Sequence, residues 1–105
     1  MARFDVYRNP GAHTAETPYL PDVQSDLLHG LETRVVVPLR RRDRFPVASL
    51  PNNLTPVFKV NGIECLLETP KLAAMPLRLL KKPVTSLATS QFKITAALDF
   101  LFQRF

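Results

Sequence analysis

Proline placement is the sequence feature that most restricts the fold of this chain. Ten of its 105 residues are proline and only three are glycine, a proline content about twice the usual frequency. Proline lacks a backbone N–H and fixes φ, so it interrupts the interior of a helix. The stretch ETPKLAAMPLRLLKKP would suit an amphipathic helix but contains Pro70, Pro76 and Pro83. We therefore expect short strands joined by stiff turns rather than a helical bundle.

Strand-forming residues occur in several short runs. The strongest local pattern is TPVFKVNGIECLL, in which Asn61 and Gly62 separate two such runs. Both residues tolerate the positive φ of a type I′ turn, so we predict a β-hairpin here. Residues 33–39, TRVVVPL, are the most strand-like segment because of their β-branched side chains. Residues 2–7, ARFDVY, alternate in the manner of a half-buried strand.

A second hairpin is predicted before the valine run. Residues 19–28, YLPDVQSDLL, have strand character. Pro21 predicts an edge position or a bulge, because proline cannot donate a hydrogen bond to a neighbouring strand. His29 and Gly30 are expected to form the turn that leads into residues 33–39.

Near the C-terminus the spacing of the apolar residues changes from strand-like alternation to the period of a helix. One helical stripe has spacings of seven, four, three and four residues, at Leu87, Ile94, Leu98, Leu101 and Phe105. Ser86 is the expected N-cap of this helix. Strands followed by one terminal helix predict a single mainly β domain over residues 1–105, either a small, partly open barrel or a sandwich.

Length and composition indicate the class of protein. A chain of 105 residues has room for one domain. Cys65 is its only cysteine, so no disulfide forms within the chain, which suits a reducing cytosol. No apolar run approaches the roughly 20 residues that span a bilayer. The opening MARFDVYRNP alternates apolar and polar side chains and does not resemble a signal peptide. We therefore expect a cytoplasmic protein.

Basic residues exceed acidic ones. The formal net charge is +5, which suits contact with nucleic acid or with an acidic partner. We predict that residues 40–53, RRRDRFPVASLPNN, form a long exposed loop. Two interpretations stay open for its arginines, a solvated cluster that maintains solubility or a binding patch. We call these arginines the basic cluster: Arg40, Arg41, Arg42 and Arg44.

Catalytic patterns are absent from the sequence. It contains no glycine-rich phosphate loop, HExxH, CxxC or GxSxG. His13 and His29 are interpreted as exposed loop residues, and Cys65 as a small buried residue rather than a nucleophile. A zinc site would have to combine these histidines with carboxylates. Carboxylates that recur four residues apart are interpreted as solvent-facing or hydrogen-bonded structural groups: Asp22 with Asp26, and Glu64 with Glu68.

The order of the segments resembles the CcdB family of bacterial toxins. The shared series consists of FDVYRN, DVQSDLL, RVVVPL, TPVFKVNG, the proline after Met75, and the terminal ITAALDFLF. The resemblance spans nearly the whole chain. DVQSDLL and its spacing to the valine run that ends at Pro38 are its most specific parts, whereas the NG hairpin and the helix pattern also occur in unrelated proteins.

This resemblance implies a fold and a mode of action. The expected fold is an SH3-like barrel with a C-terminal helix, acting as a cytoplasmic homodimer. Family members bind the A subunit of DNA gyrase, trap the enzyme on cleaved DNA and are neutralised by a partly disordered antitoxin, CcdA. They perform no covalent chemistry and need no cofactor.

The resemblance also implies which residues of this sequence would bind gyrase. Leu27 and Leu28 stand where the family has two isoleucines of the partner surface, an exchange that keeps apolar area. Asp99 replaces an asparagine of the helix and adds a negative charge. The family's final tryptophan, glycine and isoleucine are central to poisoning, and this sequence has Gln103, Arg104 and Phe105 there. Glutamine cannot supply the apolar area of a tryptophan anchor, which is worth about 2 to 4 kcal/mol.

Antitoxin-binding residues are implied by the same resemblance. Antitoxins of the CcdA type are acidic in their toxin-binding segment, so the basic cluster would steer their association. Phe102 matches a family phenylalanine and is assigned to the same surface. A different interpretation is that Phe102 and Phe105 complete the dimer interface or the barrel core. Phe105 is also a candidate for a displaced anchor at the altered tip.

Three functions are consistent with the sequence. The first is a gyrase-directed toxin with an altered tip. The second is an endoribonuclease, because the related MazF and Kid toxins share the barrel and the basic cluster is suited to RNA phosphates. The third is a protein that binds antitoxin but does not poison gyrase.

Overall fold

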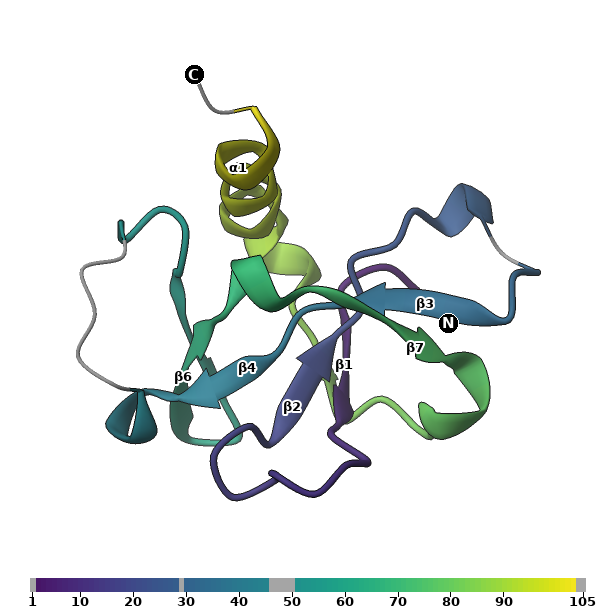
Figure 1. The fold of residues 1–105 in the computed structure, drawn as a ribbon, viewed down its shortest axis with the longest axis horizontal. Helices are drawn as coiled ribbons and strands as arrows, with labels where there is room; N and C mark the ends of the chain where they lie inside the picture. Colours follow the sequence, from purple (N-terminus) through teal and green to yellow (C-terminus); the bar gives the residue numbers. More distant parts are fainter. Residues whose placement is uncertain (1, 29, 46–50, 104–105) are drawn as a thin grey trace.

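A mainly β fold with one longer helix is present in the computed structural model, which describes residues 2–28, 30–45 and 51–103 (Figure 1). The strands are β1 (Asp5–Arg8), β2 (Tyr19–Pro21), β3 (Thr33–Val36), β4 (Leu39–Arg41), β5 (Val57–Val60), β6 (Ile63–Leu67), β7 (Ala73–Pro76) and β8 (Thr85–Ser86). The α-helix is α1 (Gln91–Phe102). Short 3-10 turns are η1 (Asp26–Leu28), η2 (Arg42–Arg44), η3 (Thr69–Lys71), η4 (Leu77–Leu79) and η5 (Ala88–Ser90).

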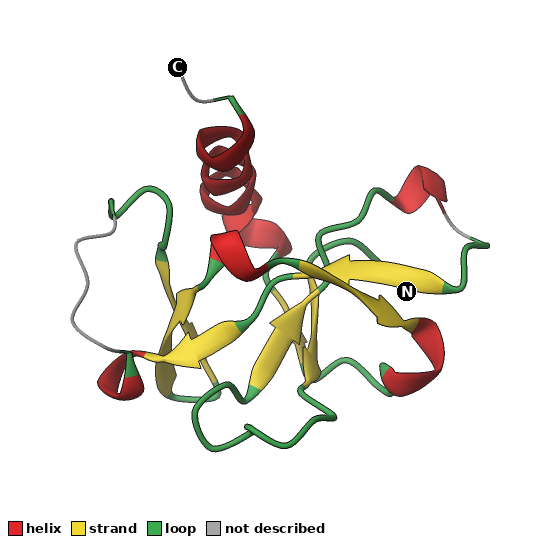
Figure 2. Cartoon of the chain, viewed as in Figure 1, coloured by secondary structure: helices red, strands yellow, loops and turns green. Residues whose placement is uncertain are grey.

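The strands form two antiparallel sheets. The larger has the order β5-β6-β4-β2-β1-β8, and the smaller pairs β3 with β7. The larger sheet is strongly curled and forms half of a small barrel (Figure 2). The predicted fold class, a mainly β SH3-like small barrel with a C-terminal helix, is confirmed.

The predicted β5–β6 hairpin is confirmed. Val60 pairs with Ile63 across Asn61 and Gly62, whose φ angles are 50° and 82°. Both turn residues therefore lie in the left-handed region that a type I′ turn requires. The two strands send alternate side chains into the core, as a period of two dictates: Phe58, Val60, Cys65 and Leu67.

The main core joins the large sheet to the terminal helix. Ile94 and Ala97 of α1 are both 0% exposed and belong to the same buried cluster as the hairpin side chains. The helix packs on η3 and η5. Lys93 adds a contact from the helix surface, with its Nζ 5.2 Å from the centre of the Phe58 ring. The helix is therefore fixed to the sheet through its first two turns.

A smaller cluster lies on the other face of β1. Tyr7 packs there with Leu20, Val36 and Leu80, while its neighbour Val6 enters the main core. β1 is thus buried on both faces rather than half-buried as predicted. The Tyr7 hydroxyl is buried and has no hydrogen-bond partner within the described ranges. Burial raises the pKa of Tyr7 to about 12.

Removing the Tyr7 hydroxyl is expected to stabilise the protein. A buried hydroxyl without a partner costs about 1 to 3 kcal/mol of desolvation, and phenylalanine fills the same space without it. We expect Tyr7→Phe to raise the free energy of unfolding in urea by about 1 kcal/mol. Tyr19→Phe is the control, because Asn61 Nδ2 donates to the Tyr19 hydroxyl at 3.3 Å. If Tyr7→Phe lost as much stability as Tyr19→Phe, the Tyr7 hydroxyl would have to have a hydrogen-bond partner, which would contradict this prediction.

The second predicted hairpin is confirmed in its pairing. Residues 19–22 run antiparallel to residues 36–39, with Tyr19 opposite Leu39 and Asp22 opposite Val36. The sequence did not predict that β3 also pairs with β7. His29 of the predicted turn lies outside the described residues.

Pro21 does not lie at an edge, because β2 runs between β1 and β4. It is tolerated as the last residue of a short strand, where its carbonyl still accepts from Val37 N–H at 3.1 Å.

The ends of two other elements also shift. The first strand begins only at Asp5, because Phe4 has a φ of 73° and turns the chain. α1 begins at Gln91 and not near Ser86. Ser86 ends β8, and its Oγ accepts from the N–H of Ala88 at 3.1 Å before η5 leads into the helix. The proline-rich stretch after β6 consists of short elements, as predicted.

Candidate functional site

Potential catalytic side chains do not form a constellation in the part of the chain that the structure describes. No group of three or more His, Cys, Asp or Glu residues within it could hold a metal ion. His13 is exposed on a loop. Cys65 is 0% exposed, and burial raises the pKa of its thiol to about 11. The thiol is therefore protonated and inaccessible at neutral pH, and its predicted role as a small buried residue is confirmed.

A buried ion pair lies beneath the segment DVQSDLL. Arg34 Nε donates to Asp22 Oδ2 at 2.6 Å, and the two side chains are 4% and 0% exposed. Arg34 Nη2 also donates to the carbonyl of Gln24 at 3.2 Å and lies 3.6 Å from Asp26 Oδ1. Asp22 and Asp26 are thus structural groups, as predicted. Arg34 itself was not predicted, although the alternation of β3 points it inward with Val36.

Further hydrogen bonds fix the segment on both sides of this pair. Gln24 donates its N–H to Asp22 Oδ1 at 2.9 Å and accepts from Val35 N–H at 3.0 Å through Oε1. Arg3 donates its N–H to Asp26 Oδ1 at 2.8 Å. Leu27 N–H donates to Ser25 Oγ at 3.1 Å. Most polar side chains of DVQSDLL therefore face the protein.

Leu27 faces the solvent at the end of this network. It lies in η1 and is 88% exposed. The backbone around it is fixed by the bonds of Asp26 and Ser25, so this side chain is a candidate for contact with a partner. We call this exposed side chain the Leu27 patch.

The end of α1 offers a second exposed surface. Phe102, the last residue of the helix, is 69% exposed, and Asp99 is exposed beside it. Gln103 N–H donates to the carbonyl of Asp99 at 2.7 Å and closes the last turn. In Figure 1 this end of the helix points away from the sheet. We call Asp99, Phe102 and Gln103 the helix-end patch.

The basic cluster is not the loop that the sequence predicts. Arg40 and Arg41 belong to β4 and pair with Leu66 and Cys65 of β6. Arg42 and Arg44 form η2. The prediction is wrong here because β-pairing continues beyond the apolar run VVVPL that marks the strand in the sequence. Residues 46–50 of the predicted loop lie outside the described residues.

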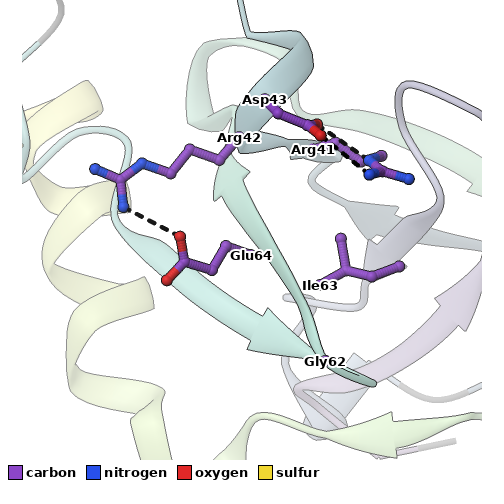
Figure 3. A pocket seen from close by; sticks show the side chains of 6 residues that line it. All are labelled: Arg41, Arg42, Asp43, Gly62, Ile63 and Glu64. Carbon is purple, nitrogen blue, oxygen red and sulfur yellow. Dashed lines mark hydrogen bonds and ion pairs between the residues drawn. The ribbon is translucent and has the colours of Figure 1, made fainter.

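Carboxylates neutralise much of the charge of the basic cluster. Arg41 donates from Nε and Nη2 to Asp43, with both distances 3.1 Å, and these hydrogen bonds lower the pKa of Asp43. Arg42 Nη1 lies 3.3 Å from Glu64 Oε1. Figure 3 shows both pairs around a surface hollow of about 330 Å³ next to Gly62 and Ile63. The hollow presents paired charges rather than a row of free cations.

A comparison with models of protein families identifies the family of this chain. Residues 3–103 match the model of the CcdB protein family. The chain belongs to the CcdB family. A search of curated proteins found no match. As a CcdB-family chain it is a toxin of a toxin–antitoxin system. The resemblance predicted from the order of the segments, and most specifically from DVQSDLL and its spacing to the valine run, is confirmed.

The residues that the resemblance implies for gyrase and antitoxin binding fall into separate groups in one chain. The Leu27 patch on η1 and the helix-end patch stand apart on the same side of the molecule in Figure 1. The basic cluster lies at a third place, beside the β5–β6 hairpin. Two of the residues implied for gyrase binding, Arg104 and Phe105, lie outside the described residues, as does the side chain of Leu28. None of the helices within the described ranges is long and apolar enough to cross a membrane.

Proposed function

We propose that this CcdB-family toxin poisons DNA gyrase in the cytoplasm. It binds the A subunit and traps the enzyme on cleaved DNA, performs no covalent chemistry itself, and is neutralised by a CcdA-like antitoxin. The observation that carries the proposal is the exposed end of α1 in a chain whose family match runs to residue 103. The gyrase-binding residues are Leu27, Leu28, Asp99, Gln103, Arg104 and Phe105.

Exposed apolar area supports this assignment. Leu27 is 88% exposed, and burying such a side chain contributes about 1.5 to 3 kcal/mol. It stands clear of the core, so gyrase can cover it without rearranging the fold. Asp99 adds a charge that has no ion pair within the described ranges and is free to meet a cation on gyrase.

A homodimer is part of the proposal. The family resemblance implies two copies of the chain. The Leu27 patch and the helix-end patch lie on different elements, η1 and α1, so a second copy would add to the contacts that one partner can make. Light scattering after size exclusion is expected to give twice the chain mass of 11.9 kDa.

Stabilised DNA cleavage is the test of the poisoning activity. The purified chain is incubated with gyrase, ATP and supercoiled plasmid, and the reaction is stopped with detergent and protease. We expect linear DNA to accumulate. Leu27→Glu is expected to raise the concentration that gives half-maximal cleavage by about tenfold or more, because a charge is costly to bury at an apolar contact. A chain ending at Phe102, without Gln103 to Phe105, is expected to lose cleavage.

Two controls make this result specific. Phe92 is 79% exposed and lies on the same helix as Phe102 but in its first turn. Phe92→Ser is expected to leave cleavage unchanged. The same preparation is incubated with single-stranded RNA. Specific cuts in the RNA without linear DNA would show an endoribonuclease in place of a gyrase poison. If neither linear DNA nor cut RNA is formed, the remaining function is binding of the antitoxin.

The proposed antitoxin surface is Phe102 with the basic cluster, Arg40, Arg41, Arg42 and Arg44. Its arginines attract an acidic segment, although three of them, Arg40, Arg41 and Arg42, already have carboxylate partners. Salt should therefore slow association only modestly.

A further inference from the structure

A surface groove with a different chemistry lies next to the end of β1. It is about 410 Å³ in volume and is formed where the chain returns from η4 to β8 and passes the residues that follow β1. Its apolar floor consists of the half-buried Leu79 and Val84, and the exposed Pro10 and Pro83 line it beside them. Its rim carries Arg8, Lys81 and Lys82, all exposed. We call this the lysine groove.

The charge of the lysine groove is unbalanced. None of the groove-lining residues is acidic. Within the described ranges, none of Arg8, Lys81 and Lys82 forms an ion pair, and Lys81 Nζ only donates to the carbonyl of Arg78 at 3.3 Å. The basic cluster, by contrast, holds Asp43 and Glu64 between its arginines. The lysine groove is thus a positive site that lacks internal counterions.

Its walls are held in place by the core. Leu80, next to the floor, is only 6% exposed and packs with Tyr7 in the smaller cluster. At the other end, Val84 N–H donates to the carbonyl of Val6 at 2.8 Å. Asn9, which lines the opposite wall, donates from Nδ2 to the carbonyl of Thr17 at 2.8 Å. A ligand therefore meets a preformed groove and does not have to order it.

We propose that the lysine groove binds an acidic polypeptide segment through an apolar side chain flanked by carboxylates. The apolar floor takes the side chain, and the rim of Arg8, Lys81 and Lys82 pairs with the acids. The apolar floor favours a peptide over a nucleic-acid backbone, whose phosphates need donors and offer nothing to cover Leu79 and Val84. The site extends beyond the proposed function, because none of its residues belongs to the surfaces assigned to gyrase or to antitoxin.

An NMR titration of the full chain tests this site. The probe is a short synthetic peptide in which glutamate and leucine alternate. We expect saturable shifts of the backbone amides of Arg8, Leu79, Lys82 and Val84. Lys81→Glu with Lys82→Glu is expected to raise the Kd by about tenfold or more. Replacing the glutamates of the peptide by glutamine, or its leucines by serine, is expected to weaken binding by about tenfold each.

A matched charge reversal outside the groove distinguishes binding in the lysine groove from non-specific electrostatic attraction. Lys59 is exposed on β5 and, like Lys82, has no ion pair within the described ranges. Lys59→Glu and Lys82→Glu make the same charge change, but only Lys82→Glu is expected to weaken binding. Equal effects of both, or equal binding of the serine peptide, would overturn the proposal. Absence of shifts at millimolar peptide, or tighter binding of a single-stranded DNA oligonucleotide at these amides, would overturn it as well.

Discussion

Replacing Arg34 with methionine is expected to lower the free energy of unfolding by about 3 to 5 kcal/mol. The change leaves Asp22, which is 0% exposed, as a buried carboxylate without its cation. It also removes the hydrogen bond from Arg34 Nη2 to the carbonyl of Gln24. The loss equals a large part of the 5 to 15 kcal/mol that stabilises a typical domain. Urea unfolding followed by far-UV circular dichroism measures it.

A double variant distinguishes a lost ion pair from lost packing. In Asp22→Asn with Arg34→Met, no buried charge remains, and the asparagine oxygen still accepts from the N–H of Gln24. We expect a coupling energy of about 1 to 3 kcal/mol between the two changes. Arg42→Met serves as the matched control, because its pair with Glu64 is exposed, and it should cost at most about 1 kcal/mol. Additive effects of the two buried changes would contradict the ion-pair explanation.

The single variant Arg34→Met also tests whether the buried ion pair fixes the segment that carries the Leu27 patch. Arg34 lies 3.6 Å from Asp26 at the start of η1, and Gln24 joins this segment to β3 through the N–H of Val35. Hydrogen exchange at Val35 should therefore accelerate in Arg34→Met. Under the proposed function, gyrase cleavage should weaken in parallel, because Leu27 is no longer held outward.

Local features of the sequence were sufficient for part of this structure. The β5–β6 turn follows from Asn61 and Gly62 alone, since only the type I′ turn uses positive φ at both positions. The burial of Cys65 follows from the alternation of the same hairpin. Asp99 and Phe102, which the family resemblance names, are exposed at the end of the helix, and their binding roles stay predictions. These features depend on neighbouring residues or on a shared order of segments.

Features set by distant partners could not be predicted. The pairing of β3 with β7 joins Val36 to Ala73, and no periodicity reports such a pairing. The ion pair of Arg34 with Asp22 and the packing of Tyr7 against Leu80 likewise join segments whose contact no periodicity reports. One local signal was available, because an arginine that alternates inward within a β-branched run requires a buried acid. The start of α1 was misjudged because Leu87, although buried, lies between β8 and η5, before the helix begins.

The terminal helix carries the surface on which the proposed function depends most, so the attachment of this helix to the sheet is the second feature to test. Among the described residues, Ile94 and Ala97 are its fully buried side chains. The polar link from the helix body is Lys93, 5.2 Å from the Phe58 ring centre, a contact worth about 0.5 to 1 kcal/mol when exposed. Apolar packing at Ile94 therefore holds the helix and orients the helix-end patch.

Shortening Ile94 to alanine is expected to cost about 2 to 5 kcal/mol, because the site is fully enclosed and the main core cannot collapse around the cavity. Phe92→Ala, two positions earlier and 79% exposed, should change stability by at most about 0.5 kcal/mol. Thermal unfolding is followed at 222 nm for the helix and by tyrosine absorbance for the sheet. Coincident transitions in Ile94→Ala would mean that helix and sheet form one cooperative unit. A helix signal lost first would mean that the helix-end patch detaches while the barrel persists, so gyrase cleavage should fall before the sheet unfolds.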